Sequence, residues 1–174
     1  MKKLFGILLL CILLLVSCGD NNTNYNNDSD TENKGSEYKT DVDVSNIADK
    51  YLEIGNNSAI GELDEGYIAI NVAESINLTL CESYKMYMDL TGSTVNQFGI
   101  YKASSEENAQ KLFEDVKSYL KMINDNLMSE YQPEEVPKLQ NATTKKNGLY
   151  VTFIVFDDSE KNEMISAFDS LLKK

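Results

Sequence analysis

Hydrophobic and polar positions divide the chain into segments with a helical period and segments with a period of two. The first helical segment has Asp43 or Ser45 as a suitable N-cap and Gly55 as a suitable end. Its apolar positions, spaced three or four residues apart, are Val44, Ile47, Ala48, Tyr51 and Leu52. Residues 62–81 fit a buried helix about as well as a strand, and we favour a helix there.

Two pairs of segments alternate bulky and polar residues, which predicts two β-hairpins. Residues 84–90 and 95–103 are joined by a Thr-Gly-Ser turn. Residues 140–146 and 149–156 flank an Asn-Gly dipeptide at position 147, and this dipeptide favours a two-residue hairpin turn.

A helix is predicted after each hairpin. Ser104 and Glu107 form a capping box, and the apolar stripe that follows ends before Pro133 and Pro137, which are incompatible with a helix interior. The stripe consists of Ala109, Leu112, Phe113, Val116, Leu120, Ile123 and Leu127. The last helix begins near residue 158, ends in two lysines that suit its dipole, and carries the apolar positions Met164, Ile165, Phe168, Leu171 and Leu172.

This order of elements predicts an α+β fold. We expect an antiparallel sheet of about four strands, formed by the two hairpins, with the helices packed on one face. Residues 84–127 and 140–172 each form a strand-strand-helix unit, and the pattern leaves open whether the two units are related copies.

The N-terminus has the features of a cleaved signal. Lys2 and Lys3 precede about 13 mainly apolar residues, too few to span a bilayer that needs roughly 20. The run Leu15-Val16-Ser17-Cys18 resembles the bacterial lipobox, which predicts a signal peptide over 1–17 and a lipid anchor, with acyl chains such as palmitate, on Cys18. The alternative is an ordinary secretory signal in which Cys18 has no role.

The segment after Cys18 is rich in asparagine and has no apolar period. We expect residues 18–42 to form a disordered tether and residues 43–174 to form a single domain. A flexible coil of about 25 residues has an r.m.s. span of roughly 25–30 Å. The sequence therefore predicts an address at the outer face of the cell membrane, with partners close to that membrane.

Composition excludes several classes of function. The chain has 16 basic and 28 acidic residues, and this acidic balance argues against nucleic-acid binding. It has no histidine, so Ser-His-Asp and Cys-His catalysis are excluded, and Cys81 is expected to be a small buried residue. A zinc site lacks its common donors. We therefore expect no metal, no cofactor and a monomeric domain.

Acidic pairs recur along the chain, and most of them suit solvated faces or helix starts. The segment 131–137 differs because two prolines stiffen it after the longest predicted helix. Its candidate binding residues are Tyr131, Pro133, Glu134 and Glu135, on an exposed acidic loop. The alternative is that Tyr131 packs beneath the loop and the prolines only end the helix.

Several of these features together resemble a known family. They are the lipobox, the Asn-rich tether, the run Gln97-Phe98-Gly99-Ile100-Tyr101-Lys102-Ala103, the segment 131–139 with its Tyr-x-Pro-Glu sequence, and the hairpin centred on Gly148. Over residues 44–172 the chain is similar to small lipoproteins of low-GC Gram-positive bacteria, catalogued as domain of unknown function 4358. The resemblance implies a fold and a membrane address, and no chemistry.

Two classes of function fit these observations. We favour a non-enzymatic module, anchored at the outer membrane surface, that binds an envelope protein, a peptide or a small ligand. The alternative is a carboxylate-dependent hydrolase acting on a cell-envelope polymer. That enzyme requires two carboxylates roughly 5 to 9 Å apart across a groove.

Overall fold

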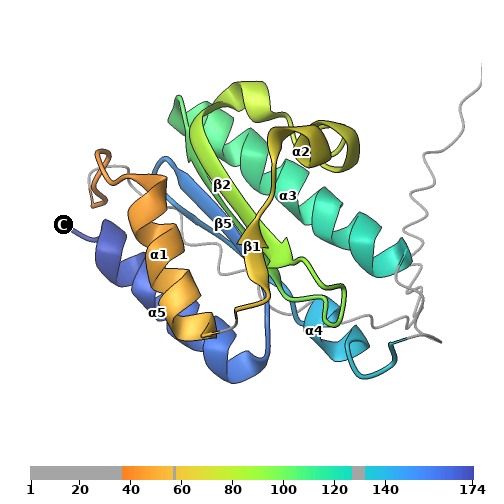
Figure 1. The fold of residues 1–174 in the computed structure, drawn as a ribbon. Coiled ribbons are helices and arrows are strands. Elements are labelled where there is room, and N and C mark those ends of the chain that lie inside the picture. Colours follow the sequence, from red (N-terminus) through yellow and green to blue (C-terminus); the bar gives the residue numbers. More distant parts are fainter. Residues whose placement is uncertain (1–36, 57, 127–131) are drawn as a thin grey trace, which may run out of the picture.

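The five strands form one antiparallel sheet that lies between two layers of helices (Figure 1). The computed structural model describes residues 37–56, 58–126 and 132–174. The elements in chain order are α1 (Val44–Gly55), β1 (Ile60–Glu62), α2 (Glu65–Asn71), the 3₁₀ helix η1 (Leu78–Leu80), β2 (Cys81–Asp89), β3 (Gln97–Ala103), α3 (Glu106–Asn126), α4 (Val136–Gln140), β4 (Thr143–Asn147), β5 (Tyr150–Val155) and α5 (Asp158–Leu172).

The sheet has the strand order β1-β2-β3-β5-β4. Both predicted hairpins are present as β2–β3 and β4–β5, and β3 pairs with β5 in the centre, with Phe98 opposite Ile154. The short strand β1 pairs with β2 and adds a fifth strand at one edge. The α+β class and the antiparallel sheet are thus confirmed, with one strand more than expected.

Helices cover both faces of the sheet, so the expectation of helices on one face is wrong (Figure 1). On β5, Val151 and Phe153 belong to the core beneath α2 and α3, whereas Tyr150 and Ile154 belong to the core beneath α1 and α5. All six residues of β5 are buried. The physical reason is that a central strand with apolar side chains on both faces must be covered on both.

The first predicted helix is confirmed as α1. The side chain of Asp43 accepts a hydrogen bond from the backbone N–H of Ser45 at 2.8 Å, which satisfies one of the free donors of the first turn. The helix includes Gly55 and is ended by Asn56, whose φ of 36° is left-handed. The favoured helix over 62–81 is correct only for α2 and η1, because the segment begins in β1 and turns before β2.

The second long helix is confirmed as α3, but its cap differs from the prediction. Ser105, and not Ser104, accepts the backbone N–H of Asn108 at 3.1 Å, and Glu107 instead pairs with Lys111 at 2.7 Å. Residue 127, the last of the predicted stripe, lies outside the described residues. The short helix α4 was not predicted, and it moves the start of the fourth strand from residue 140 to Thr143.

The last predicted helix is confirmed as α5, and it is joined at its end by a segment that was assigned to the tether. Tyr38 forms an antiparallel bridge with Lys173, and the backbone N–H of Lys39 donates to the carbonyl of Leu172 at 2.8 Å. The fold therefore includes residues 37–42. The predicted signal peptide, Cys18 and the rest of the tether lie outside the described residues.

Candidate functional site

The predicted acidic loop is only partly exposed. Pro133 and Glu134 face solvent, whereas Glu135 is 6% exposed, and Tyr131 lies outside the described residues. One carboxylate oxygen of Glu135 accepts the backbone N–H of Val95 at 2.9 Å. The expectation that Glu135 is exposed is therefore wrong, because it holds the β2–β3 loop in place. A contact role for Pro133 and Glu134 stays a prediction.

Glu135 belongs to a polar group that we call the Glu135 cluster. It consists of Glu135, Lys138 and Asn96, whose side chains are largely enclosed, and of Asp157, whose side chain is exposed at the edge of the group. The ammonium of Lys138 lies 3.0 Å from Glu135 Oε1, 3.3 Å from Asn96 Oδ1 and 3.5 Å from Asp157 Oδ2. These residues come from the β2–β3 loop, α4 and the start of α5. The cluster therefore joins three segments, as expected of a structural element.

Asp89 organises the same β2–β3 loop from within. Its carboxylate accepts backbone N–H groups of Thr91 at 2.8 Å and Thr94 at 3.1 Å, together with the hydroxyls of both threonines. The hydrogen bonds from Thr91, followed by those from Thr94, lower the pKa of Asp89 below its usual value although burial opposes them. Gln132 adds a hydrogen bond to the carbonyl of Gly92 at 3.0 Å.

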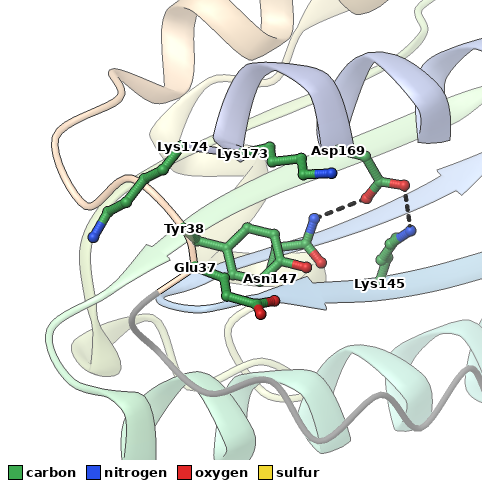
Figure 2. Close-up of a pocket in the computed structure, with 7 residues that line it drawn as sticks. All are labelled: Glu37, Tyr38, Lys145, Asn147, Asp169, Lys173 and Lys174. Atoms are coloured by element: carbon green, nitrogen blue, oxygen red, sulfur yellow. Dashed lines mark hydrogen bonds and ion pairs between the residues drawn. The ribbon is translucent and has the colours of Figure 1, made fainter.

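A polar pocket lies at the other end of α5, beside the segment that enters the fold (Figure 2). Its volume is about 530 Å³, within the size range of small-molecule sites. We call it the lysine pocket. Its walls come from the entering segment, β4 and the end of α5, and they consist of Glu37, Tyr38, Lys145, Asn147, Asp169, Lys173 and Lys174.

Backbone contacts hold these three walls together. Gly148, in the turn after β4, has a left-handed φ of 57°, and a Cβ at this position would lie 3.3 Å from Tyr38 Cβ. The absence of a side chain there lets Tyr38 pack against the turn. The backbone N–H of Lys174 donates to the carbonyl of Glu37 at 3.2 Å, and the ammonium of Lys39 donates to the carbonyl of Leu171 at 3.1 Å.

Asp169 organises the donors inside the pocket. Its Oδ2 lies 2.7 Å from the ammonium of Lys145, and its Oδ1 accepts the side-chain amide of Asn147 at 2.8 Å. Figure 2 shows the ammonium of Lys173 extending toward Asp169 and that of Lys174 pointing away. No hydrogen bond or ion pair of the Lys173 ammonium occurs within residues 37–56, 58–126 and 132–174.

The charges of the pocket oppose those of the whole protein. Three lysines and two carboxylates line it, whereas the chain carries a formal net charge of −12. The lining offers ammonium groups together with a tyrosine ring. Chemically, such an arrangement suits the recognition of a small anionic group.

Cys81 is not suited to nucleophilic catalysis. Burial, with a smaller effect from the nearby carboxylate of Asp115, raises the pKa of the Cys81 thiol to about 12. The thiol is therefore protonated at neutral pH, and it packs at the edge of the core beneath α2 and α3.

The part of the chain that the structure describes offers neither a metal-binding cluster nor a membrane-spanning helix. Within it, no group of three or more histidine, cysteine or acidic side chains is arranged to hold a metal ion. Its helices are too short or too polar for any of them to cross a bilayer.

Sequence reasoning did not find the lysine pocket. Tyr38 fell within the predicted tether, and Lys173 was explained by the dipole of the last helix. Lys145 lay on a predicted strand with no motif around it. The one local signal was the Asn147-Gly148 turn, which predicts a close backbone approach but gives no indication of what approaches it.

Comparison with known proteins identifies a similarity for the middle part of the chain. Neither the curated proteins nor the solved structures contain a match to it. A family model matches residues 74–156, the region from η1 to the end of β5. The match leaves out α1, α5 and five of the seven residues that line the lysine pocket. The chain thus contains a region, residues 74–156, that is similar to the family described as "Domain of unknown function (DUF4358)".

Proposed function

We propose that this protein is a lipid-anchored, extracytoplasmic binding module without enzymatic activity, and that the lysine pocket is its binding site. The observation that supports this most directly is the composition of the pocket walls. Glu37 and Tyr38 line the pocket, and they are the first residues of the described fold. The pocket therefore lies where the predicted tether from Cys18 joins the domain.

The anchor and the pocket are close along the chain. About 19 residues separate Cys18 from Glu37, and a flexible coil of that length has an r.m.s. span of about 25 Å. A ligand in the pocket is then held within a short distance of the membrane surface. This position supports a ligand that belongs to the membrane or to the envelope layer directly above it.

The chemistry of the pocket supports binding over catalysis. Both carboxylate oxygens of Asp169 accept hydrogen bonds from neighbouring side chains, those of Lys145 and Asn147. Asp169 therefore orders donors that line the pocket, as expected of a binding site. The alternative is a carboxylate-dependent hydrolase, which would release soluble fragments of its polymer substrate.

The anchor is tested with the variant Cys18→Ser of the full-length chain, expressed in a Gram-positive host. Metabolic labelling with a palmitate analogue should mark the wild-type protein and leave the variant unlabelled. The variant should also accumulate as an uncleaved precursor or be shed into the medium. Unchanged membrane retention without incorporated lipid would contradict the proposal.

The binding role is tested by co-sedimentation of the full-length protein, in neutral detergent, with isolated cell-envelope fragments. We expect retention on the fragments that is reduced by each of the single variants Lys145→Met and Lys173→Met. Retention should be unchanged in Lys111→Met, which removes one positive charge from the exposed face of α3. The supernatant should contain no released fragments of polymer. Soluble products that accumulate with time would favour the hydrolase instead.

A further inference from the structure

We infer that the lysine pocket takes a phosphoryl-bearing anion, held between the ammonium groups of Lys145 and Lys173. This inference rests on the proposed binding role of the pocket and adds the chemical class of the ligand. The supporting observation is that Lys145 and Lys173, from different segments of the chain, line the same pocket together with the carboxylate of Asp169 (Figure 2).

The pocket has donors that its own carboxylate does not use. An ammonium group has three N–H donors, and Lys145 directs one of them to Asp169 at 2.7 Å. The ammonium of Lys173 has no acceptor within the described ranges. Several N–H donors therefore remain available to oxygens of a ligand.

Asp169 acts as a positioning residue in this arrangement. Its two oxygens hold Lys145 and Asn147 at 2.7 and 2.8 Å, so these two side chains are ordered before any ligand arrives. The Lys145–Asp169 pair is 26% and 45% exposed. Because exposed ion pairs are weak, Lys145 can share its charge with a second anion at little cost.

The phosphoryl group fits these donors better than a carboxylate does. It presents several acceptor oxygens around one centre, so it can accept hydrogen bonds from two ammonium groups at once, and lysine is a common phosphate ligand. The volume of about 530 Å³ also leaves room for an ester substituent of the size of glycerol. The tyrosine ring of Tyr38 forms one wall for that substituent (Figure 2).

The position of the lysines is not explained by the helix dipole alone. The ammonium of Lys39 already donates to the carbonyl of Leu171 in the last turn of α5. Lys173 follows the last helical residue, and its backbone N–H rather than its ammonium bonds the helix, through the carbonyl of Asp169 at 2.9 Å. Its ammonium extends instead across the pocket.

The experiment is a calorimetric titration of the full-length protein in neutral detergent. Inorganic phosphate and sn-glycerol 1-phosphate probe a soluble source of the phosphoryl group. Micelles doped with phosphatidylglycerol, compared with micelles doped with zwitterionic phosphatidylcholine, probe a lipid headgroup. Binding in either the soluble arm or the phosphatidylglycerol arm supports the inference, and the arm that binds identifies the source.

Two variants of the pocket should change the affinity for the phosphoryl compound in opposite directions. Lys173→Met should weaken binding by about fivefold or more, because one of the two cationic contacts is lost. Asp169→Asn should tighten it by about threefold, because the competing negative charge is removed while the amide oxygen still accepts a hydrogen bond and so keeps a neighbouring donor in position. Lys111→Met, on α3 at the opposite face of the sheet from α5, should have no effect. Circular dichroism checks that each variant is folded.

Absence of binding in both arms overturns the inference, as does weaker binding by Asp169→Asn, which would indicate a cationic or zwitterionic ligand. Failure here is distinguishable from failure of the proposed function. If envelope retention still depends on Lys145 and Lys173 while no phosphoryl compound binds, the pocket is a binding site for another class of ligand. If retention does not depend on these lysines, the proposed function itself is wrong.

Discussion

The Glu135 cluster and the lysine pocket lie at opposite ends of α5, and each is built around a lysine–carboxylate pair. In the cluster, the side chains of Lys138 and Glu135 are 12% and 8% exposed. In the pocket, those of Lys145 and Asp169 are 26% and 45% exposed. The same two chemical groups are thus enclosed at one end of the helix and open at the other.

The difference in burial separates a structural pair from a candidate binding pair. Removing one partner of a buried pair leaves the other charge without compensation in a low-dielectric region, which is strongly destabilising. An open pair contributes little to stability because water screens it, and it remains accessible to a ligand. The cluster should therefore respond mainly in stability and the pocket mainly in binding.

The largest expected effect is that of Glu135→Ala. The substitution removes the nearest carboxylate partner of the Lys138 ammonium and the acceptor of the backbone N–H of Val95. The free energy of unfolding should fall by about 3 kcal/mol, measured by urea denaturation. The neighbouring Glu134→Ala, at an exposed position, should change it by less than about 0.5 kcal/mol. If the two variants lowered the free energy of unfolding equally, Glu135 would not be a structural residue, and the Glu135 cluster would not differ from the lysine pocket in this respect.

The next effect is that of Asp89→Ala, and it depends on pH. At pH 7 the variant should lose about 2 kcal/mol, because a carboxylate that accepts bonds from Thr91 and Thr94 is removed. The folded-state pKa of Asp89 is lowered from 3.8, so its ionised form stabilises the fold above that value. This contribution is lost as pH falls through the lower, folded-state pKa.

Denaturation of both proteins from pH 7 down to pH 2 measures this dependence. The difference between wild type and Asp89→Ala should narrow as pH falls below about 4. A difference that stays constant over the whole range would show that the carboxylate charge of Asp89 does not stabilise the loop.

A smaller effect is expected at the pocket itself, for Gly148→Ala. Its φ of 57° disfavours any residue with a Cβ, at a cost of about 1 kcal/mol. Gly92→Ala is the matched control, because its φ is 68° but a Cβ there would meet nothing within 4 Å. Thermal unfolding should show Gly148→Ala to be the more damaging by a few tenths of a kcal/mol, owing to the contact with Tyr38. If Gly92→Ala is the more damaging, Tyr38 does not pack against the turn.

The smallest change in stability is expected for Asp169→Asn. Its ion pair with Lys145 is open to solvent, so its loss should lower the free energy of unfolding by less than about 1 kcal/mol. The same urea denaturation as for Glu135→Ala allows a direct comparison. A loss as large as that of Glu135→Ala would mean that the pocket pair is structural.

Local periodicity was sufficient for most of the elements. The helical spacing predicted α1, α3 and α5, and the alternation around Asn147-Gly148 predicted β4 and β5. The short elements β1 and α4 were missed, because three or five residues carry too little of a period to be recognised. The placement of helices on both faces was also missed. Alternation along a strand shows which residues share a face of the sheet, but it does not predict which element packs against that face.

For the candidate sites, the local sequence pattern singles out certain residues, but their roles depend on contacts that form only in the folded protein. The Pro- and Glu-rich segment 131–137 has a clear local pattern, yet Glu135 is buried because Val95 and Lys138 come to it in the folded state. The lysine pocket has no local pattern at all, since its entering segment lies more than 100 residues before the other two walls, and those two walls are themselves more than 20 residues apart. Burial and convergence of charge are properties of long-range packing, which the order of neighbouring residues does not contain.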